Sequence, residues 1–198
     1  MGTVVALSGQ VGGAKLADGL RRLRGADLVV IVNTGDDHEV FGLAFSPDID
    51  TMLYTLSGMA AAAAGWEPAG ETYALHETLH RMGSEHRVRV GDRSYALPLL
   101  RTEALRQDVP LSQITLGFCN TLGSEARGLP MSKDPVGTVV VTADGHVSYH
   151  EYLTELECEP VVKGFLYAGA DVARIPDEVL DALHAPDLEA IVLCPANP

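Results

Sequence analysis

The sequence is poor in cysteine, and this scarcity limits the kinds of fold and site that it can encode. Its three cysteines, Cys119, Cys158 and Cys194, are odd in number and widely separated. They therefore fit neither a disulfide framework nor a CxxC metal site. Because free cysteine is among the most often buried residues, we expect all three to be structural thiols inside a protein of the reducing cytoplasm.

Basic residues and long apolar runs are scarce as well. Lys and Arg number 14 against 27 Asp and Glu, which gives a net charge of −13 and no basic footprint for nucleic acid. The first apolar run, Val4–Leu7, is too short for a signal peptide, and no stretch has the length of a membrane span. These absences argue against nucleic-acid and membrane partners and predict a soluble, cytoplasmic protein with a solvated acidic surface.

The seven histidines show neither a metal-binding spacing nor a catalytic arrangement. His76 and His80 are four residues apart, but no HExxH motif surrounds them, so the pair is typical of a helix surface. No Ser-His-Asp or Cys-His constellation is recognisable. The chain thus lacks the sequence patterns of a zinc enzyme and of a hydrolase with a nucleophilic side chain.

The N-terminal segment contains a clear βαβ pattern. Thr3–Ser8 is an apolar run typical of a buried strand, Ala14–Leu23 has apolar residues at helical spacing, and Leu28–Asn33 is a second β-rich run. This order is typical of a parallel sheet. We predict an α/β fold with a Rossmann-like parallel sheet and helices on both faces.

The middle of the chain departs from this rhythm. We predict one domain, 1–198, in which 1–56 and 160–198 form the Rossmann-like core and 57–159 is an inserted subdomain of helices and a hairpin. The predicted helices are Met52–Met59, Glu71–Met82, Leu97–Gln107, Ser112–Leu122 with Ser112 as its N-cap, and Asp177–His184. Because the chain stops directly after an apolar strand, we expect a C-terminal truncation.

The remaining segments are predicted from alternation and turn residues. The predicted strands are Val88–Arg93 leading into a turn, the hairpin Thr138–Thr142 and His146–Tyr152 around an Asp-Gly turn, Val162–Tyr167, and Ala190–Leu193. Leu129–Pro135 is predicted to be a rigid polar loop because two prolines bracket it.

A glycine-rich segment, Ser8-Gly-Gln-Val-Gly-Gly-Ala-Lys15, joins the first strand to the first helix. Glycines let a backbone approach an anion, a helix N-terminus offers N–H groups, and Lys15 adds a positive charge. The segment is neither GxGxxG nor Walker A, so a tight turn without a ligand is the alternative. The predicted phosphate-binding residues are Ser8, Gly9, Gly12, Gly13, Lys15 and Asn33.

Two acidic pairs follow this segment. Asp36 and Asp37 lie in a glycine turn after the second strand, and Asp48 and Asp50 lie two residues apart. Hard carboxylate oxygens near a phosphate site suit Mg²⁺, and the first pair also suits ribose hydroxyls. The alternatives are an ordinary Asp-rich turn for the first pair and a cap of the following helix for Asp48.

Two more polar segments are candidates for ligand recognition. Arg89 with Gly91-Asp-Arg93 places two guanidinium groups beside an acid, which suits phosphate or carboxylate recognition. A surface salt bridge is the alternative. In Pro130-Met-Ser-Lys-Asp-Pro135, prolines flank a polar Ser-Lys-Asp set, with an ordinary loop as the alternative.

In their order and spacing, these motifs resemble the 2-phospho-L-lactate transferase family of coenzyme F420 biosynthesis along nearly the whole chain. The matching blocks are Ser8–Leu16, VNTGDD (Val32–Asp37), SPDIDTMLYTLSG (Ser46–Gly58), GDR (Gly91–Arg93), LLRTE (Leu99–Glu103), LPMSKDPV (Leu129–Val136), Glu159–Gly164 and CPANP (Cys194–Pro198). The departures from the family are Gln10 for a glycine, Ser94 and Pro98 after GDR, Lys133 for an acid, and Gly137 for an arginine.

The resemblance implies a Mg²⁺-dependent phosphotransferase. Such an enzyme moves a phospholactyl or related phospho-acid group from a guanosine-diphosphate-activated donor to the deazaflavin Fo and releases GMP. Positioning and charge neutralisation dominate this chemistry. The implied catalytic residues are Asp50 and Asp37, the implied metal ligands are Asp36, Asp37, Asp48 and Asp50, and the implied substrate contacts are Asp50, Arg89, Asp92, Arg93, Ser132 and Asp134. A homodimer is compatible with the family.

Two alternative functions stay open. A non-catalytic regulator of the gluconeogenesis-factor type, which binds a nucleotide-sugar, usually has a GGSSGRLR-like stretch where this chain has GDDHEVFGLAF at Gly35–Phe45. A shortened paralogue would bind a ligand without turnover. A nicotinamide dehydrogenase is disfavoured because the glycine spacing differs from its fingerprint.

Overall fold

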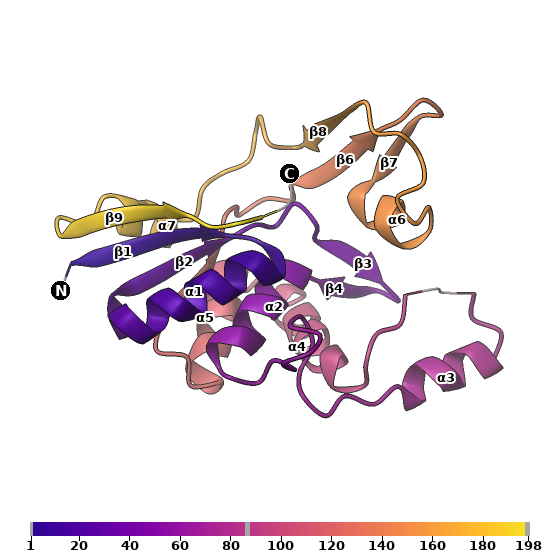
Figure 1. Cartoon of the computed structure of the whole chain (residues 1–198), viewed down its shortest axis with the longest axis horizontal. Helices are drawn as coiled ribbons and strands as arrows, with labels where there is room; N and C mark the ends of the chain where they lie inside the picture. Colours follow the sequence, from indigo (N-terminus) through magenta and orange to yellow (C-terminus); the bar gives the residue numbers. More distant parts are fainter. Residues whose placement is uncertain (1, 86–87, 197–198) are drawn as a thin grey trace.

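The computed structural model describes residues 2–85 and 88–196, and a parallel sheet forms its centre (Figure 1). The strands run in the order β5-β2-β1-β9 and are parallel throughout. Their bounds are β1 Thr3–Ser8, β2 Leu28–Val32, β5 Arg127–Pro130 and β9 Leu188–Leu193. Helices pack on both faces of this sheet, so the predicted α/β, Rossmann-like architecture is confirmed.

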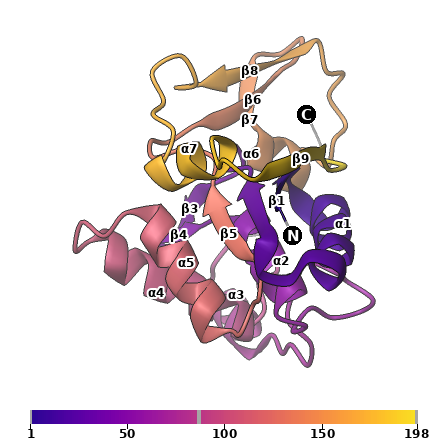
Figure 2. The same ribbon diagram turned by 90° about the vertical axis from the view of Figure 1, so that its left-hand side faces the viewer.

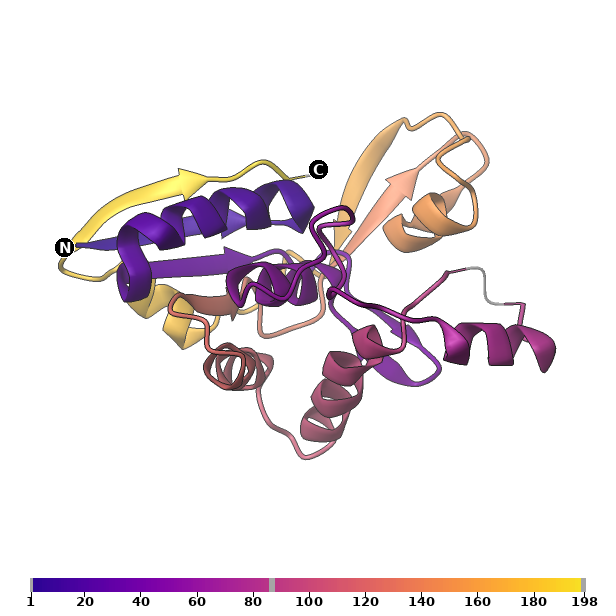
Figure 3. The ribbon, with the colours of Figure 1, turned by 60° about the horizontal axis from the view of Figure 1, so that its bottom comes forward.

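The central strands are continuous apolar runs, which parallel strands need because they are covered on both faces. All five residues of β2 are buried. Ala17 and Leu53 share a core with Val30 on one face, and Val179 packs with Val29 on the other. The helices that supply these residues are α1 (Gln10–Arg24) and α2 (Pro47–Leu56) on the first face and α7 (Asp177–Leu183) on the second (Figure 3).

Strand β5 corrects the prediction of a loop at Leu129–Pro135, because the first two residues of that segment belong to the main sheet. Glycine and proline are rare inside strands, but an edge strand tolerates proline. A Cβ on Gly128 would lie 2.3 Å from Met52 Cε and 3.2 Å from Cys119 Sγ. Glycine therefore lets β5 pack tightly between α2 and α5 (Leu111–Thr121).

A second, antiparallel sheet of order β7-β6-β8 lies apart from the main one (Figure 2). Its elements are β6 (Gly137–Val141), β7 (His146–Ser148), α6 (Tyr149–Thr154) and β8 (Gly164–Ala168). Tyr149 and Tyr152 of α6 pack on Val140. The predicted hairpin arm His146–Tyr152 is wrong beyond Ser148, because the Ser148 hydroxyl accepts the Glu151 N–H and starts the helix.

The strand pairings also differ from the predicted division of the chain into a core and an insertion. Strand β5, from the predicted insertion 57–159, pairs with β2 of the main sheet. Strand β8, from the predicted core segment 160–198, pairs with β6 of the small sheet. The prediction was wrong because alternation identifies a strand without identifying its neighbour.

The remaining elements lie between β2 and α5 along the chain. Strands β3 (His38–Val40) and β4 (Leu43–Phe45) form a hairpin, and α3 (Ala74–Arg81) and α4 (Ala96–Leu105) follow. Phe41 and Gly42 at the hairpin turn have φ of 53° and 73°, as a tight two-residue turn requires. Every described helix is too short or too polar to cross a lipid bilayer.

Two local predictions in this part of the chain are wrong. The segment Val88–Arg93 contains no strand, and its last residue begins a short 3-10 helix. Ser112 lies inside α5, which follows Pro110, and its hydroxyl donates to Glu178 Oε1 at 3.0 Å. Ser112 is therefore a buried partner of the Glu178 carboxylate and does not cap its own helix.

The three cysteines differ in exposure. Cys119 is buried, Cys194 is half-buried and Cys158 is exposed. The expectation of buried thiols is therefore wrong for Cys158, which follows α6 in a turn with φ of 60°. Asn197 and Pro198, the end of the CPANP block, lie outside the described residues.

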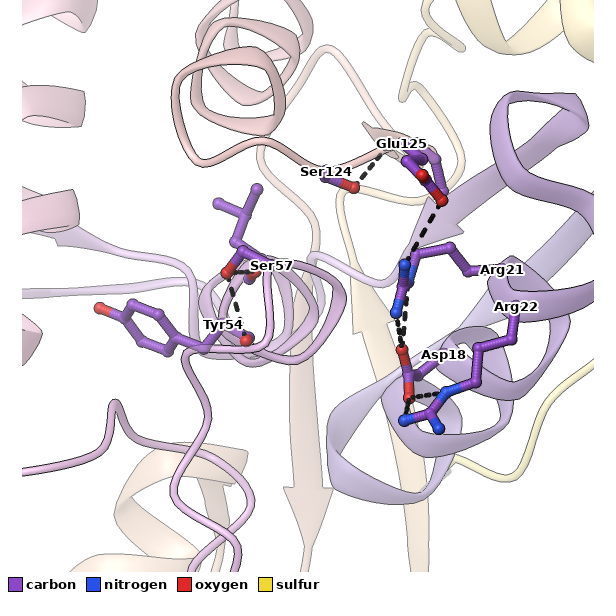
Figure 4. A network of polar contacts seen from close by, with 9 residues as sticks. Asp18, Arg21, Arg22, Tyr54, Ser57, Ser124 and Glu125 are labelled. Atoms are coloured by element: carbon purple, nitrogen blue, oxygen red, sulfur yellow. Dashed lines mark hydrogen bonds and ion pairs between the residues drawn. The ribbon is translucent and has the colours of Figure 1, made fainter.

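Ion pairs on the surface join α1 to the loop before β5 (Figure 4). Asp18 accepts hydrogen bonds from Arg21 at 2.8 Å and from Arg22 at 2.7 Å. Arg21 also lies 3.5 Å from Glu125 Oε2. Exposed ion pairs contribute only about 0–1 kcal/mol each, so the apolar cores hold this helix on the sheet.

The glycine contact of β5 gives a test of the fold. We expect Gly128→Ala to lower the free energy of unfolding by about 1–3 kcal/mol, because the added methyl group overpacks the space next to Met52. Urea denaturation measures this change. Gly117→Ala in α5 is the matched control, since its Cβ would meet nothing within 4 Å.

We expect that control to stabilise the protein by about 0.5–1 kcal/mol, the usual gain when alanine replaces glycine inside a helix. An unchanged stability of Gly128→Ala would contradict the close packing of β5 between α2 and α5.

Candidate functional site

The candidate site lies where β1 and β2 end and where α1 and α2 begin. Asn33, directly after β2, donates its backbone N–H to the Ser8 carbonyl oxygen at 2.9 Å. Asp48, in the first turn of α2, accepts the Gln10 N–H at 3.0 Å and the Asn33 side-chain amide at 2.8 Å. A single carboxylate thus joins three chain segments. The alternative that Asp48 caps its own helix is wrong, because it contacts the start of α1.

The loop in the glycine-rich segment is shorter than the sequence indicates. Helix α1 begins at Gln10, directly after Gly9, so Gly12 and Gly13 belong to its first turn. A Cβ on Gly13 would lie 2.5 Å from Ser8 Oγ, and one on Gly12 would lie 3.4 Å from Pro195. These glycines therefore let α1 approach the ends of β1 and β9.

Binding of phosphate at this helix start stays a prediction. The first bond inside α1 runs from the Gly13 N–H to the Gly9 carbonyl oxygen, so the helix leaves the N–H groups of Val11 and Gly12 without an intrahelical acceptor. Lys15 is exposed and lies beside Gly65 instead of the cavity described below. Its predicted phosphate contact has no support in this arrangement.

Asp36 and Asp37 follow Asn33 in a turn that folds inward. Asp37 Oδ2 accepts the Ser46 hydroxyl at 2.9 Å. Within the described chain, Oδ1 of Asp36 and Oδ1 of Asp37 are buried and have no hydrogen-bond partner. Unpaired buried carboxylate oxygens are costly and are satisfied by protonation or by a cation.

Burial dominates the ionisation of this pair. It raises the pKa of Asp36 to about 7, and the charge of Asp48 adds to the rise. Burial also raises the pKa of Asp37 to about 8, although the Ser46 hydroxyl and the Arg101 guanidinium oppose it. Burial raises the pKa of Asp48 as well, against its hydrogen bonds from Asn33 and Gln10.

Asp50 has a different environment because Arg101 of α4 forms a buried ion pair with it. Arg101 is only 1% exposed, and it donates to both carboxylate oxygens of Asp50 and to the Ala44 carbonyl oxygen. Burial raises the pKa of Asp50, and the guanidinium opposes that rise.

Arg101 was not among the predicted site residues, although it lies in the LLRTE block. The available signal was an arginine in an otherwise apolar stretch of helix, Leu97–Leu100 followed by Arg101. Such a residue needs a buried partner, but the sequence does not name that partner.

A cavity of about 440 Å³ opens beside these carboxyl groups. Asp36, Asp48 and Asp50 line it, so three of the four predicted metal ligands share one space. Arg89 lines it too, and its Cζ lies 3.6 Å above the centre of the Tyr73 ring. Other lining residues are Tyr54 of α2, Trp66, His38, Phe45 and His150.

Asp92 and Arg93 are not among the residues that line this cavity. Asp92 instead accepts the Thr72 hydroxyl at 2.6 Å and the N–H groups of Ala74 and Leu75, and so caps α3. Arg93 donates to the Ala69 carbonyl oxygen at 2.8 Å. Both side chains hold the chain around α3, and their predicted contact with a substrate has no support from this geometry.

Ser132 and Asp134 lie elsewhere again. The Ser132 hydroxyl accepts the Asp134 N–H at 3.1 Å, and the Asp134 carboxylate pairs with Arg174 at 2.6 Å. Lys133, next to them, pairs with Asp177 at 3.0 Å. Ser132, Lys133 and Arg174 line a separate cavity of about 310 Å³ that shares no lining residue with the first. The two predicted substrate contacts are thus not brought to the aspartate cluster.

Comparisons with known proteins agree on one family. A family model described as 2-phospho-L-lactate transferase CofD matches residues 4–198. A 2-phospho-L-lactate transferase of Methanopyrus kandleri is 38% identical over 193 residues, 97% of this chain and 61% of the relative. A phosphoenolpyruvate transferase of Streptomyces avermitilis is 37% identical over 201 residues, 98% of this chain and 62% of the relative. The chain spans about three fifths of the length of these relatives.

Solved structures support the fold. Protein BH3568 of Bacillus halodurans matches with a TM-score of 0.60 at 18% identity, over 96% of this chain and 57% of that one. A second structure of the same protein, described as a member of the UPF0052 family, matches with a TM-score of 0.57. At this identity, the likeness extends to the fold alone.

The buried carboxyls give a first test of the site. We expect the free energy of unfolding of the metal-free protein to fall as the pH rises from about 4 to about 8. Because the pKa values of Asp36 and Asp37 are raised on folding, the folded state binds more protons in this window, and a rising pH favours the unfolded state. The slope is on the order of 1 kcal/mol per pH unit for each carboxyl.

Urea denaturation at several pH values measures this slope. The neutral isosteres Asp36→Asn and Asp37→Asn should each flatten the curve, whereas Asp181→Asn on the exposed side of α7 should leave it unchanged. Curves that keep the wild-type slope in both buried variants would show that these carboxyls do not titrate as described.

The ion pair of Arg101 gives a second test. We expect Arg101→Met to lower the free energy of unfolding by about 3–5 kcal/mol, because it leaves Asp50 buried without its counter-charge. Chemical denaturation measures the loss. The double variant Asp50→Asn/Arg101→Met should be more stable than Arg101→Met alone, since it removes the stranded charge.

Arg106→Met, at the exposed end of the same helix, is the matched control and should change stability by no more than about 0.5 kcal/mol. If the double variant were as unstable as Arg101→Met, packing of the arginine rather than its charge would explain the effect.

Proposed function

Since the chain belongs to the 2-phospho-L-lactate transferase CofD family, we propose that it is a transferase of phospho-acid groups in coenzyme F420 biosynthesis. In this proposal it takes a phospholactyl or related group, such as the enolpyruvyl analogue, from a guanosine-diphosphate-activated donor. The acceptor is a hydroxyl of the deazaflavin Fo, and GMP is released. The names of the Methanopyrus and Streptomyces relatives support the class of group that is transferred.

The observation that carries the proposal is the cluster of four aspartates, three of which, Asp36, Asp48 and Asp50, line one cavity. Phosphoryl transfer needs positioned oxygens and neutralised charge more than covalent help from the protein. The buried, unpartnered oxygens of Asp36 and Asp37 suit a hard divalent cation, and the negative charge of Asp48 acts on both of these carboxyl groups. We propose that these three residues hold Mg²⁺, which would neutralise charge on the phosphate groups.

Asp50 has another task in this proposal. Arg101 engages both of its oxygens and offsets the burial of its negative charge. A carboxylate held in this way keeps lone pairs toward the cavity that it lines, and can accept a hydrogen bond from the acceptor hydroxyl. Asp50 then orients that hydroxyl for attack on phosphorus, while Arg101 acts as its positioning residue.

The two ends of the cavity suit the two substrates. The start of α1 offers backbone N–H groups and the positive end of the helix dipole to the donor phosphates. The other walls carry Trp66, Phe45 and the guanidinium of Arg89, which suit a planar aromatic acceptor. In this proposal the donor binds at the start of α1 and the acceptor binds against the aromatic residues.

The proposal is tested by incubating the protein with Fo, a guanylylated phospholactate or phosphoenolpyruvate and Mg²⁺. We expect GMP by chromatography and a phosphorylated deazaflavin by mass spectrometry. Asp50→Asn should lower turnover by about 10²–10⁴-fold, the usual effect of losing a group that assists proton transfer. Its affinity for Fo, measured by fluorescence titration, should change far less.

Asp181→Asn, on the exposed side of α7, is the matched control and should keep wild-type turnover. Binding of Fo without any GMP release would favour a non-catalytic relative. The absence of both binding and turnover would refute the proposed function, and turnover of Asp50→Asn within a few-fold of wild type would refute the role of Asp50.

A further inference from the structure

Two histidines, for which the sequence predicts no role, meet an aspartate in the wall of the main cavity. His38 comes from β3, His150 from α6, and Asp36 from the turn after β2. One ligand atom from each residue lies within 4.8 Å of the other two. His38 and His150 lie far apart in the sequence, so no spacing motif could have indicated that they meet.

A hydrogen bond fixes His38 in a tautomer that can bind a metal ion. Its Nδ1 lies 2.8 Å from the Asp36 carbonyl oxygen. A carbonyl oxygen only accepts, so Nδ1 carries the proton and the lone pair of this ring is on Nε2. Metal-binding histidines have this arrangement in most proteins, with the second ring nitrogen bound to a carbonyl or carboxylate that fixes the tautomer.

Asp36 supplies the anionic ligand. Its Oδ1 is buried and accepts no hydrogen bond from the described residues. An oxygen in this position gains a partner when a cation binds beside it. The carboxylate has two oxygens, so it can bind an ion here while it also faces the other aspartates.

The two rings now stack, with centroids 3.8 Å apart and planes 24° apart, and His38 also stacks on Phe45. Ligand atoms around a tetrahedral zinc ion with bonds of about 2.0–2.2 Å lie roughly 3.3–3.5 Å from one another. Ligation therefore needs the edges of the rings to converge by rotation of the His150 side chain. This residue is half-buried beside a cavity, which leaves room for that rotation.

The chemical types of the three ligands indicate which kind of metal ion the site would bind. Imidazole nitrogen suits Zn²⁺ and other first-row transition ions, whereas Mg²⁺ prefers oxygen ligands and keeps its waters. We propose that Asp36, His38 and His150 form a binding site for a transition-metal ion such as Zn²⁺, which shares Asp36 with the proposed magnesium site and differs from it in its two imidazole ligands. All three side chains line the cavity, so the open coordination positions of the ion face it and can take an anionic oxygen of a ligand.

The site also links two parts of the fold. His38 and Asp36 belong to the segment that follows the main sheet, and His150 belongs to the helix of the small sheet. An ion bound by these three residues would connect the two sheets. Since an ion that binds only the folded state stabilises it, Zn²⁺ should raise the melting temperature of the protein.

The test is direct binding of Zn²⁺ to the whole, metal-stripped chain without substrates, by competition with a chromophoric chelator. We expect one equivalent per chain, retained in excess Mg²⁺. His150→Gln and His38→Gln should each weaken binding by more than about 100-fold, because loss of a ligand exceeds the loss of a second-shell partner. His80→Gln is the matched control, since His76 and His80 form another pair, with ring centroids 4.7 Å apart, on exposed α3.

A readout that needs no variant is the NMR spectrum of the Co²⁺ form. Two paramagnetically shifted, exchangeable imidazole N–H signals support the site, and none or one overturns it. The proposal is also overturned if the chain binds no stoichiometric Zn²⁺, or if His80→Gln weakens binding while His150→Gln does not. Because no substrate is present, these outcomes are independent of the proposed transferase activity.

Discussion

Helix α2 is surrounded by other elements along nearly its whole length, and two carboxyl groups lie in its first turn. Water cannot solvate these groups, so each must find donors within the protein. Asp48 finds them at the start of α1 and after β2, and Asp50 finds Arg101 on α4. The requirement to satisfy two buried carboxylates thus fixes how α1, α2 and α4 meet, and residues of α1 and α2 line the cavity.

The need for partners that are distant in the sequence also explains which features could be predicted from the sequence and which could not. The βαβ unit was predictable because β2 is a continuous apolar run and the glycines before α1 are local signals. The acidic residues were assigned to a site because of the resemblance to the family. Arg101 stayed without a role because an ion pair between residues distant in sequence leaves no local pattern.

Local patterns were also insufficient for the outer strands. The short β5 contains a glycine and a proline, which favour a loop, and only its place at the sheet edge makes it a strand. The length of β8 was predicted well, but its partner was not, since antiparallel pairing with β6 depends on where the chain turns. The candidate site was less affected by these errors because Asn33, Asp36 and Asp37 follow β2 directly and Asp48 and Asp50 lie in the first turn of α2.

The walls of the cavity come from several parts of the chain, and one of them carries Trp66. This residue is the sole tryptophan of the sequence and is 47% exposed. Indole emission depends on the polarity around the ring, so the tryptophan fluorescence of the chain arises at the cavity without any added label. The molecule therefore has an optical probe of its own at the place where its ligands are proposed to bind.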